Sequence, residues 1–199
     1  VIPQRGSLVL DSALTVGFWL RVDSMQANYP LISVRPNTPQ TSIDHQAGGP
    51  TNWYEPGWGI GMEYRSVYNE KTGKWDLYYP NVTGYVSTDQ APDGRGARLG
   101  NWVGNDDQGY MIRKPGLWHY VAMTWDGRVS QNNARLFLDG MLISTGNIVG
   151  RLETGTNPIV IGNVSGSSSL YESQGWAMDE LHIWNRALTD EEVFQLSSN

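Results

Sequence analysis

Four aromatic residues fall in or beside two long stretches of the sequence that show no regular periodicity, 35–57 and 89–109. They are Trp53, Tyr54, Trp58 and Trp102, and their polar neighbours include Asn52, Glu55, Asn101 and Asn105. Tryptophan and tyrosine combine an apolar ring with a polar group, so they suit half-exposed binding surfaces. A sugar can stack on such a ring while nearby polar groups bind its hydroxyls. The pattern therefore indicates a glycan-binding surface, with burial of the rings to anchor the loops as the alternative interpretation.

A second group of polar side chains falls in residues 58–80, which alternate in polarity around a turn at 70–73. The pattern predicts a β-hairpin in which Tyr68 pairs with Trp75, because this pairing separates an apolar face from a polar one. The polar face would carry Glu63, Arg65, Asp76 and Tyr78. This face is either a solvated sheet or the floor of a binding groove, to which Arg65 and Tyr78 would contribute.

Glu63 and Asp76 on this predicted face could form a pair of carboxylates for acid–base catalysis. Arg65 beside them favours ordinary cross-strand ion pairing instead. The sequence has no Gly-x-Ser-x-Gly elbow for a serine nucleophile. Its glycine-rich segment 94–109 lacks the Lys-Ser/Thr ending of a phosphate-binding loop. We therefore assign no catalytic residue and favour a non-catalytic protein over an enzyme.

The amino-acid composition limits the kinds of binding partner and site that this chain can have. The chain has 199 residues, with 14 basic and 20 acidic side chains and a formal net charge of −6. This balance argues against nucleic acid or an anionic membrane as a partner, because both attract basic surfaces. No apolar run approaches the roughly 18 residues that a membrane span requires, so we expect no membrane insertion. The absence of cysteine excludes disulfides, thiolate zinc sites and cysteine nucleophiles.

Short segments of alternating polarity predict an all-β fold around these candidate sites. Residues 14–22 place apolar side chains on one face and Trp19 and Arg21 on the other. Asp139-Gly140, between two apolar runs, predicts a hairpin with a type I′ turn, because both central residues of that turn need a positive φ. Further strands are predicted at 30–34, 85–88, 110–113, 117–125, 158–161 and 176–184. Short strands at such spacing are typical of a sandwich or barrel.

One short helix is predicted near the end of the sequence. Thr189 and Glu192 have the spacing of a capping box, in which each side chain binds the backbone N–H of the other residue. Leu188 and Val193 occupy the positions of a hydrophobic staple. Three consecutive acids, residues 190–192, also favour the positive end of the helix dipole. We therefore expect a C-terminal helix that packs on the β-sandwich.

Three parts of the sequence carry a resemblance to a known family. They are LTVGFWLRVDS at 14–24, LWHYVAMTWDG with ARLFLDGMLIS at 117–127 and 134–144, and PIVIGN with GWAMDELHIWNRALTDEEV at 158–163 and 175–193. In this order they resemble the laminin G-like branch of the concanavalin A-like jelly rolls. The resemblance implies one domain spanning residues 1–199, a two-sheet antiparallel jelly-roll β-sandwich with one short C-terminal helix and roughly twelve to fourteen strands.

The same resemblance implies a structural calcium ion, because jelly rolls of this family often hold one at the rim. The pentraxin-like relatives place it between the long early loop and the loop after the IVIG-type strand. Those positions fall near Asp44 and at residues 163–172, where Glu172 is the one carboxylate. Asp179 is a further candidate ligand, with a solvated or loop-bracing residue as the alternative. Calcium prefers six to eight oxygen ligands, so these carboxylates would form part of its shell.

The function that the resemblance implies is glycan or polysaccharide binding by a secreted module at the cell surface or outside the cell. Such modules occur alone or beside other domains of a larger chain. The predicted binding residues are Trp53, Tyr54, Trp58, Trp102, Asn105, Arg65 and Tyr78. Two alternatives stay open: a glycoside hydrolase or polysaccharide lyase of the same fold, and a protein-adhesion module. The known hydrolase branch carries a Glu-x-Asp-x-Glu run on one strand, and this sequence has none.

Overall fold

The alternation of residues 14–22 produces a strand, β1 (Ala13–Val22), with one face in the core. Its inward side chains are completely buried: Leu14, Val16, Phe18 and Leu20. Because successive side chains of a strand point to opposite faces, Trp19 and Arg21 lie on the other face, where both are half-buried. The register of this one strand therefore determines which residues reach the surface beside it.

The computed structural model describes residues 2–3, 10–23, 29–34, 57–90, 97–99, 112, 114–152, 158–162 and 175–198. For residues 29–30, 63–68, 75–79 and 97–98 it describes the backbone alone.

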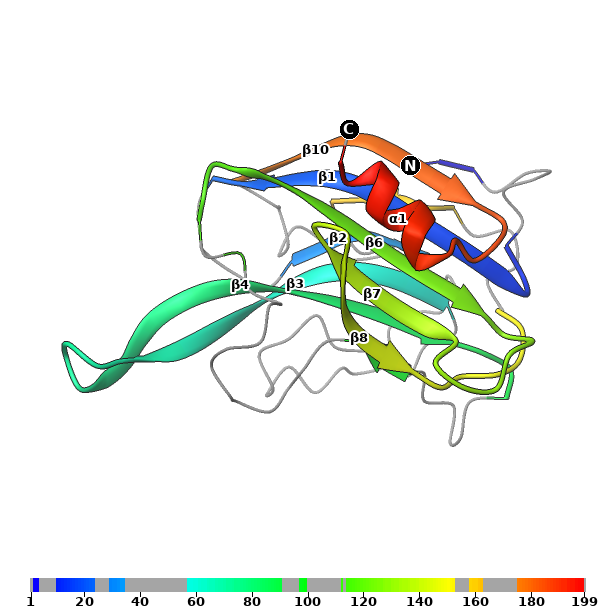
Figure 1. Ribbon diagram of the computed structural model, residues 1–199, viewed down its shortest axis with the longest axis horizontal. Coiled ribbons are helices and arrows are strands. Elements are labelled where there is room, and N and C mark those ends of the chain that lie inside the picture. Colours follow the sequence, from blue (N-terminus) through cyan, green and yellow to red (C-terminus); the bar gives the residue numbers. More distant parts are fainter. Residues whose placement is uncertain are drawn as a thin grey trace.

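The described residues form ten strands and one helix, arranged as two antiparallel five-stranded sheets (Figure 1). The first sheet has the order β10-β1-β6-β7-β8 and the second the order β5-β4-β3-β2-β9. The remaining elements are β2 (Tyr29–Val34), β3 (Gly57–Asn69), β4 (Lys74–Ser87), β5 (Ala97–Leu99), β6 (Trp118–Asp126), β7 (Ala134–Leu138), β8 (Met141–Gly146), β9 (Val160–Ile161), β10 (Trp176–Trp184) and α1 (Asp190–Leu196). Two stacked antiparallel sheets with one short C-terminal helix confirm the predicted fold class.

The core lies between the two sheets and is made of the inward residues of both. The first sheet contributes Phe18, Met123 and Trp125, and the second contributes Trp58 and Ile60. Each such side chain stabilises the fold by about 1.5–3 kcal/mol when it leaves water completely. Between β7 and β8, Asp139 and Gly140 have φ values of 52° and 76°, as the predicted type I′ turn requires.

The hairpin of β3 and β4 extends beyond the stacked sheets as a two-stranded arm (Figure 1). At its tip Asn69 pairs with Lys74, which agrees with the predicted register. Between Val67 and Asn69 the register shifts by one residue, so that Ser66 pairs with Tyr78. A shift of one residue moves every later side chain of a strand to the opposite face. The predicted faces are therefore wrong for most of the arm.

A second hydrophobic cluster attaches α1 to the outer face of the first sheet. It contains Tyr120, Ala122, Phe137, Leu188 and Val193. The predicted capping box is confirmed, because Glu192 N donates to the Thr189 hydroxyl and Thr189 N donates to the Glu192 carboxylate. Hydrogen bonds to Arg186 and to the Thr189 N–H lower the pKa of Glu192 to about 2. The helix start therefore stays charged and capped over most of the pH range.

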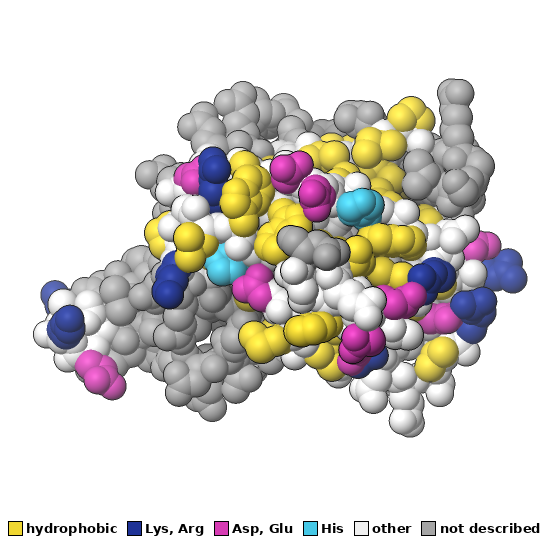
Figure 2. Space-filling view, turned by 45° about the horizontal axis from the view of Figure 1, so that its top comes forward, with side chains coloured by type: hydrophobic (Ala, Val, Ile, Leu, Met, Phe, Trp, Pro, Cys, Tyr) yellow, Lys and Arg dark blue, Asp and Glu magenta, His cyan; other side chains and the backbone are white. Residues whose placement is uncertain are grey.

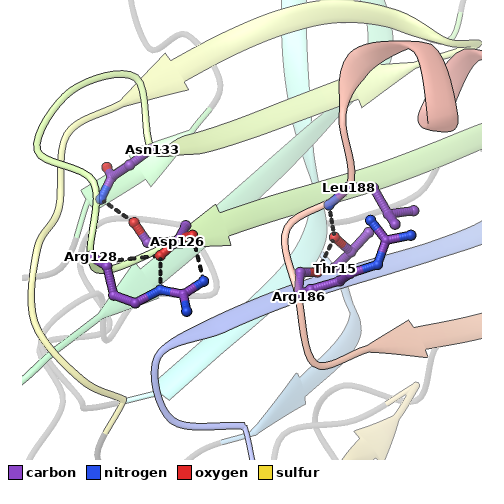
Figure 3. Close-up of polar contacts among 6 residues, drawn as sticks. All are labelled: Thr15, Asp126, Arg128, Asn133, Arg186 and Leu188. Atoms are coloured by element: carbon purple, nitrogen blue, oxygen red, sulfur yellow. Dashed lines mark hydrogen bonds and ion pairs between the residues drawn. The ribbon is translucent and has the colours of Figure 1, made fainter.

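Two small polar networks fix the connections around the first sheet (Figure 3). In one, the Thr15 hydroxyl of β1 donates to Arg186 O at 2.8 Å and accepts from Leu188 N at 2.9 Å. In the other, the Asn133 side chain donates to Asp126 O, and the Asp126 carboxylate pairs with Arg128 at 2.8 Å. The first network holds the segment that leads into α1 against β1.

We predict that Thr15→Val destabilises the protein by about 1–3 kcal/mol, because Arg186 O and Leu188 N lose their partner inside the protein. Thr15→Ser is the matched control, since it keeps the hydroxyl. Urea unfolding measures both. An unfolding midpoint for Thr15→Val equal to that of Thr15→Ser would contradict this role of the hydroxyl.

Candidate functional site

The predicted binding and metal-binding residues fall into two groups in the structure. Trp53, Tyr54, Trp102, Asn105, Asp44 and Glu172 lie outside the described residues. Their roles in glycan or calcium binding therefore stay predictions. The other four, Trp58, Arg65, Tyr78 and Asp179, lie on β3, β4 and β10.

Trp58 is a residue of the core. It lies on β3, pairs with Val34 and Val86, and is 0% exposed. A completely buried ring has no face on which a sugar could stack, so the proposed ligand role of Trp58 is wrong and the alternative of burial describes it. The alternation of Trp58, Ile60 and Met62 with glycines at 57, 59 and 61 was the available signal for an inward position.

Arg65 and Tyr78 do not share one face of the arm. Arg65 pairs with Tyr79, and Tyr78 pairs with Ser66, so the two predicted residues occupy opposite faces. The same register separates Glu63 from Asp76, because Glu63 pairs with Asn81 and Asp76 is adjacent to Leu77, the partner of Val67. The single groove floor predicted for these four residues, with its pair of carboxylates, is therefore not formed.

The strongest candidate site among the described residues lies on the outer face of the first sheet. Four ring-bearing residues project there from three neighbouring strands: Trp118 of β6, Trp19 of β1, and His182 and Trp184 of β10. We call these four the outer aromatic row. Figure 2 views this side of the molecule and shows hydrophobic side chains with acidic, basic and histidine side chains among them.

The strand register orders this row. Trp118 lies opposite Arg21, and Tyr120 lies opposite Trp19 on the next step along the two strands. On the other side of β1, Gly17 pairs with His182 and Thr15 with Trp184. Neighbouring strands are about 4.8 Å apart and side chains on one face repeat about every 6.6 Å. The outer aromatic row therefore crosses the sheet as an extended surface of rings.

Contacts between side chains hold these rings in place. The Arg21 guanidinium lies 5.2 Å from the centre of the Trp118 ring. Trp19 meets Tyr120 edge to face at 5.4 Å, and His182 stacks on Trp184 at 5.4 Å. Trp118 is nevertheless 41% exposed, which leaves much of its ring open to a ligand. The surface is therefore partly preorganised and still accessible.

A β-bulge adds two carboxylates beside the row. The pairing of β1 with β10 shifts between Gly17 and Trp19, and Glu180 adopts a φ of 47°. Both Met178 and Leu181 pack against the core, so Asp179 and Glu180 between them lie on the outer side, and both are exposed. Burial, and secondarily the charge of Glu180, raise the pKa of Tyr120 to about 12. The phenol therefore stays neutral beside the acidic pair.

Asp179 was also predicted as a calcium ligand. Its carboxylate accepts a hydrogen bond from Glu180 N at 2.8 Å, a contact that fits the alternative of a bracing residue. The part of the chain that the structure describes contains no group of three His, Asp or Glu residues able to hold a metal ion. A single carboxylate does not supply the six to eight oxygens that calcium takes. The described residues by themselves therefore do not build the predicted site.

The outer aromatic row was not predicted from the sequence, although the sequence contained part of the evidence for it. The alternation of β1 placed Trp19 and Arg21 outward, and strand 117–125 carried bulk on both faces. What the sequence lacked was the order of the strands. Trp118 and Trp184 are 66 positions apart in the chain, yet both strands flank β1.

The chain matches the family model of the concanavalin A-like lectin/glucanases superfamily (Laminin G 3) over residues 1–194. A search of curated proteins gives no match. Among the described residues, no helix is long and apolar enough to cross a membrane.

Several solved structures are similar in fold. The botulinum neurotoxin serotype G binding domain has a TM-score of 0.57 and 14% identity, over 98% of this chain and 39% of that one. A heptameric SAP-like pentraxin from Limulus polyphemus has a TM-score of 0.56 and 16% identity, over 94% of this chain and 71% of that one. A Trypanosoma rangeli sialidase has a TM-score of 0.51 and 17% identity, over 94% of this chain and 22% of that one. This chain thus spans well under two thirds of the toxin domain and of the sialidase.

We predict that Gly17→Ala disturbs the row, because a Cβ at this position would lie 2.4 Å from the Tyr120 hydroxyl. The loss of stability should be about 1–3 kcal/mol, as for other overpacked sites. In a Tyr120→Phe background, which removes the hydroxyl, the same change should cost markedly less. Denaturant unfolding of the four proteins gives the coupling energy. Additive effects would contradict the close approach of Tyr120 to β1.

Proposed function

This chain belongs to the concanavalin A-like lectin/glucanase superfamily, and from that premise we propose that it is a carbohydrate-binding module without catalytic activity. The observation that carries the proposal is the outer aromatic row, in which Trp118 and His182 are exposed, Trp19 and Trp184 are half-buried, and hydrogen-bonding side chains lie beside the rings. Similar folds include a toxin binding domain and a sialidase, which are consistent with a role in binding carbohydrate. The family and the surface chemistry favour the same function.

The row suits a sugar because of the way its rings alternate with polar groups. The exposed Trp118 ring offers an apolar surface to the C–H face of a pyranose. Arg21, Asp179 and Glu180 lie beside the rings and can donate to or accept from hydroxyl groups. Each stacked ring contributes on the order of 1 kcal/mol, so several contacts are needed for useful affinity.

The placement of the carboxylates in the described part of the chain supports a role without catalysis. Glycoside hydrolysis uses two carboxyl groups that face each other across the bond to be broken, one of them kept protonated. Glu63 and Asp76 occupy opposite faces of the arm. Asp179 and Glu180 are consecutive, exposed residues of one bulge and not a pair from two facing elements.

We propose that the loop residues predicted from the sequence form a second region that contacts the same glycan. Trp53, Tyr54, Trp102 and Asn105 would bind further sugar units, and a calcium ion near Asp44 and Glu172 would brace the same loops. We also propose that the module acts outside the cell, where polysaccharides are accessible to it. Protein adhesion is the competing function, because Trp, Tyr and Arg are enriched in protein interfaces as well.

We predict that Trp118→Ala lowers the affinity for the preferred glycan about tenfold, equal to 1.4 kcal/mol, while the fold is kept. The exposed ring makes few internal contacts whose loss would destabilise the protein. Leu117→Ala is the matched control, because Leu117 is adjacent and 51% exposed but is not part of the row. Isothermal titration calorimetry after a polysaccharide screen measures both.

Two results would count against the proposal. Absence of binding to every glycan in the screen would leave protein adhesion as the better account. If Trp118→Ala and Leu117→Ala bind the glycan with equal affinity, and Trp53→Ala or Trp102→Ala binds it much more weakly, the glycan-binding site lies in the loops and not on the sheet.

A further inference from the structure

We infer that the outer aromatic row recognises an amino sugar, with the protonated amine held beside Trp19 by Asp179 and Glu180. This inference rests on the proposed function, because it names the class of glycan that the same surface selects. It follows from the distribution of charge over the row, from the geometry of the bulge in β10, and from a buried hydroxyl group without a partner.

The positive charge at one end of the row is already neutralised. Arg21 Nε donates to Asp23 Oδ1 at 2.8 Å and Arg21 Nη2 donates to Asp23 Oδ2 at 3.1 Å. This two-bonded pair leaves Arg21 without net attraction for an anionic sugar. Asp179 and Glu180 differ from it, since neither takes part in an ion pair with another described residue. Among the described residues, the row therefore carries two negative charges that no ion pair compensates.

The bulge is the reason that both acids lie on this surface. In a regular strand Asp179 and Glu180 would point to opposite faces, and one carboxylate would point into the core. The left-handed φ of 47° at Glu180 prevents this and costs about 1–2 kcal/mol for a residue other than glycine. Bulges often re-aim side chains near functional sites, and strained backbone is frequent there. Here the strain keeps two adjacent carboxylates at the surface.

Trp19 and Tyr120 complete this corner of the row. Asp179 lies directly opposite Trp19 on one side of β1, and Tyr120 lies opposite Trp19 on the other. The Tyr120 hydroxyl is buried without a hydrogen-bond partner, and Tyr120 is only 2% exposed. It lies over Gly17, whose partner on β10 is His182, two residues after Glu180. A buried hydroxyl without a partner calls for an explanation. Its oxygen is covered in this structure, so an ammonium N–H can donate to it only when the side chains that cover it move on binding.

These groups together match a protonated amine attached to a sugar. An ammonium is attracted to a tryptophan face as well as to carboxylates. The remaining rings, above all the accessible Trp118, would stack on the sugar that carries the amine or on its neighbour. An anionic glycan would meet Asp179 and Glu180 as like charges, and an N-acetylated sugar would lose the charge attraction.

A matched pair of ligands tests the inference. Oligomers of glucosamine with free amines and the same oligomers after N-acetylation differ at that nitrogen alone. Calorimetry at mildly acidic pH, where the amines are protonated, should give about tenfold higher affinity for the free amine. High salt should reduce this preference, because exposed charges are screened.

Two variants test whether the preference for the free amine depends on the carboxylates of the bulge. Glu180→Asn removes the charge with a residue that tolerates a left-handed φ. Asp179→Asn removes the charge and keeps an oxygen that can accept from Glu180 N. Each should lower the preference for the free amine at least threefold. Glu70→Gln at the exposed turn of the β3–β4 arm is the control and should leave the preference unchanged.

The outcomes separate this inference from the proposed function. Equal binding of the two oligomers, or a preference that survives both Asn variants, overturns amine recognition and leaves glycan binding in place. Absence of binding to any glycan overturns both. Equally tight binding of a lysine-rich peptide, with no effect of Trp118→Ala, overturns the inference in favour of a protein partner.

Discussion

The pairing of β1 with β6 on one side and β10 on the other determines what this molecule presents on the outer face of its first sheet. The inward residues of β1 are completely buried, so the strand cannot slip by one residue without moving them into water. This constraint fixes Trp19 and Arg21 outward. It also aligns them with Tyr120, Trp118 and Asp179, which the chain supplies from distant positions. The core thus sets the order of the surface rings.

The C-terminal helix divides that outer face into two parts. The helix lies against the outer face of the first sheet (Figure 1). Leu188 and Val193 cluster with Phe137 and Ala122, and Trp19 and Trp184 pack against the same cluster as partly buried residues. The Thr15 hydroxyl holds the segment before the helix to β1, one step along the strand from Gly17. The helix therefore supports one side of the outer aromatic row and leaves Trp118 accessible. Trp19 and Trp184 therefore belong both to the packing under the helix and to the outer aromatic row.

Sequence analysis predicted the fold class well, because that prediction depended on local signals. Alternating polarity identified β1, positive φ requirements identified the Asp139–Gly140 turn, and side-chain spacing identified the capping box. The functional sites were predicted less well, because the position of their residues depends on how the strands pair. Trp58 resembled a loop aromatic until its place between Val34 and Val86 was known. A shift of one residue near Val67 reversed the predicted faces of the arm, and the bulge at Glu180 has no local sequence signal.

The most direct test of the account is a titration of the indole N–H signals of the nine tryptophans by ¹H–¹⁵N NMR, with the tightest-binding oligosaccharide as ligand. If the outer aromatic row binds sugar, the Trp19 and Trp118 signals will shift together with a single affinity. The signals of Trp58 and Trp125, whose rings lie in the core, will stay in place and serve as internal references. Saturable binding with no shift at Trp19 or Trp118 would contradict the account and place the recognition surface elsewhere.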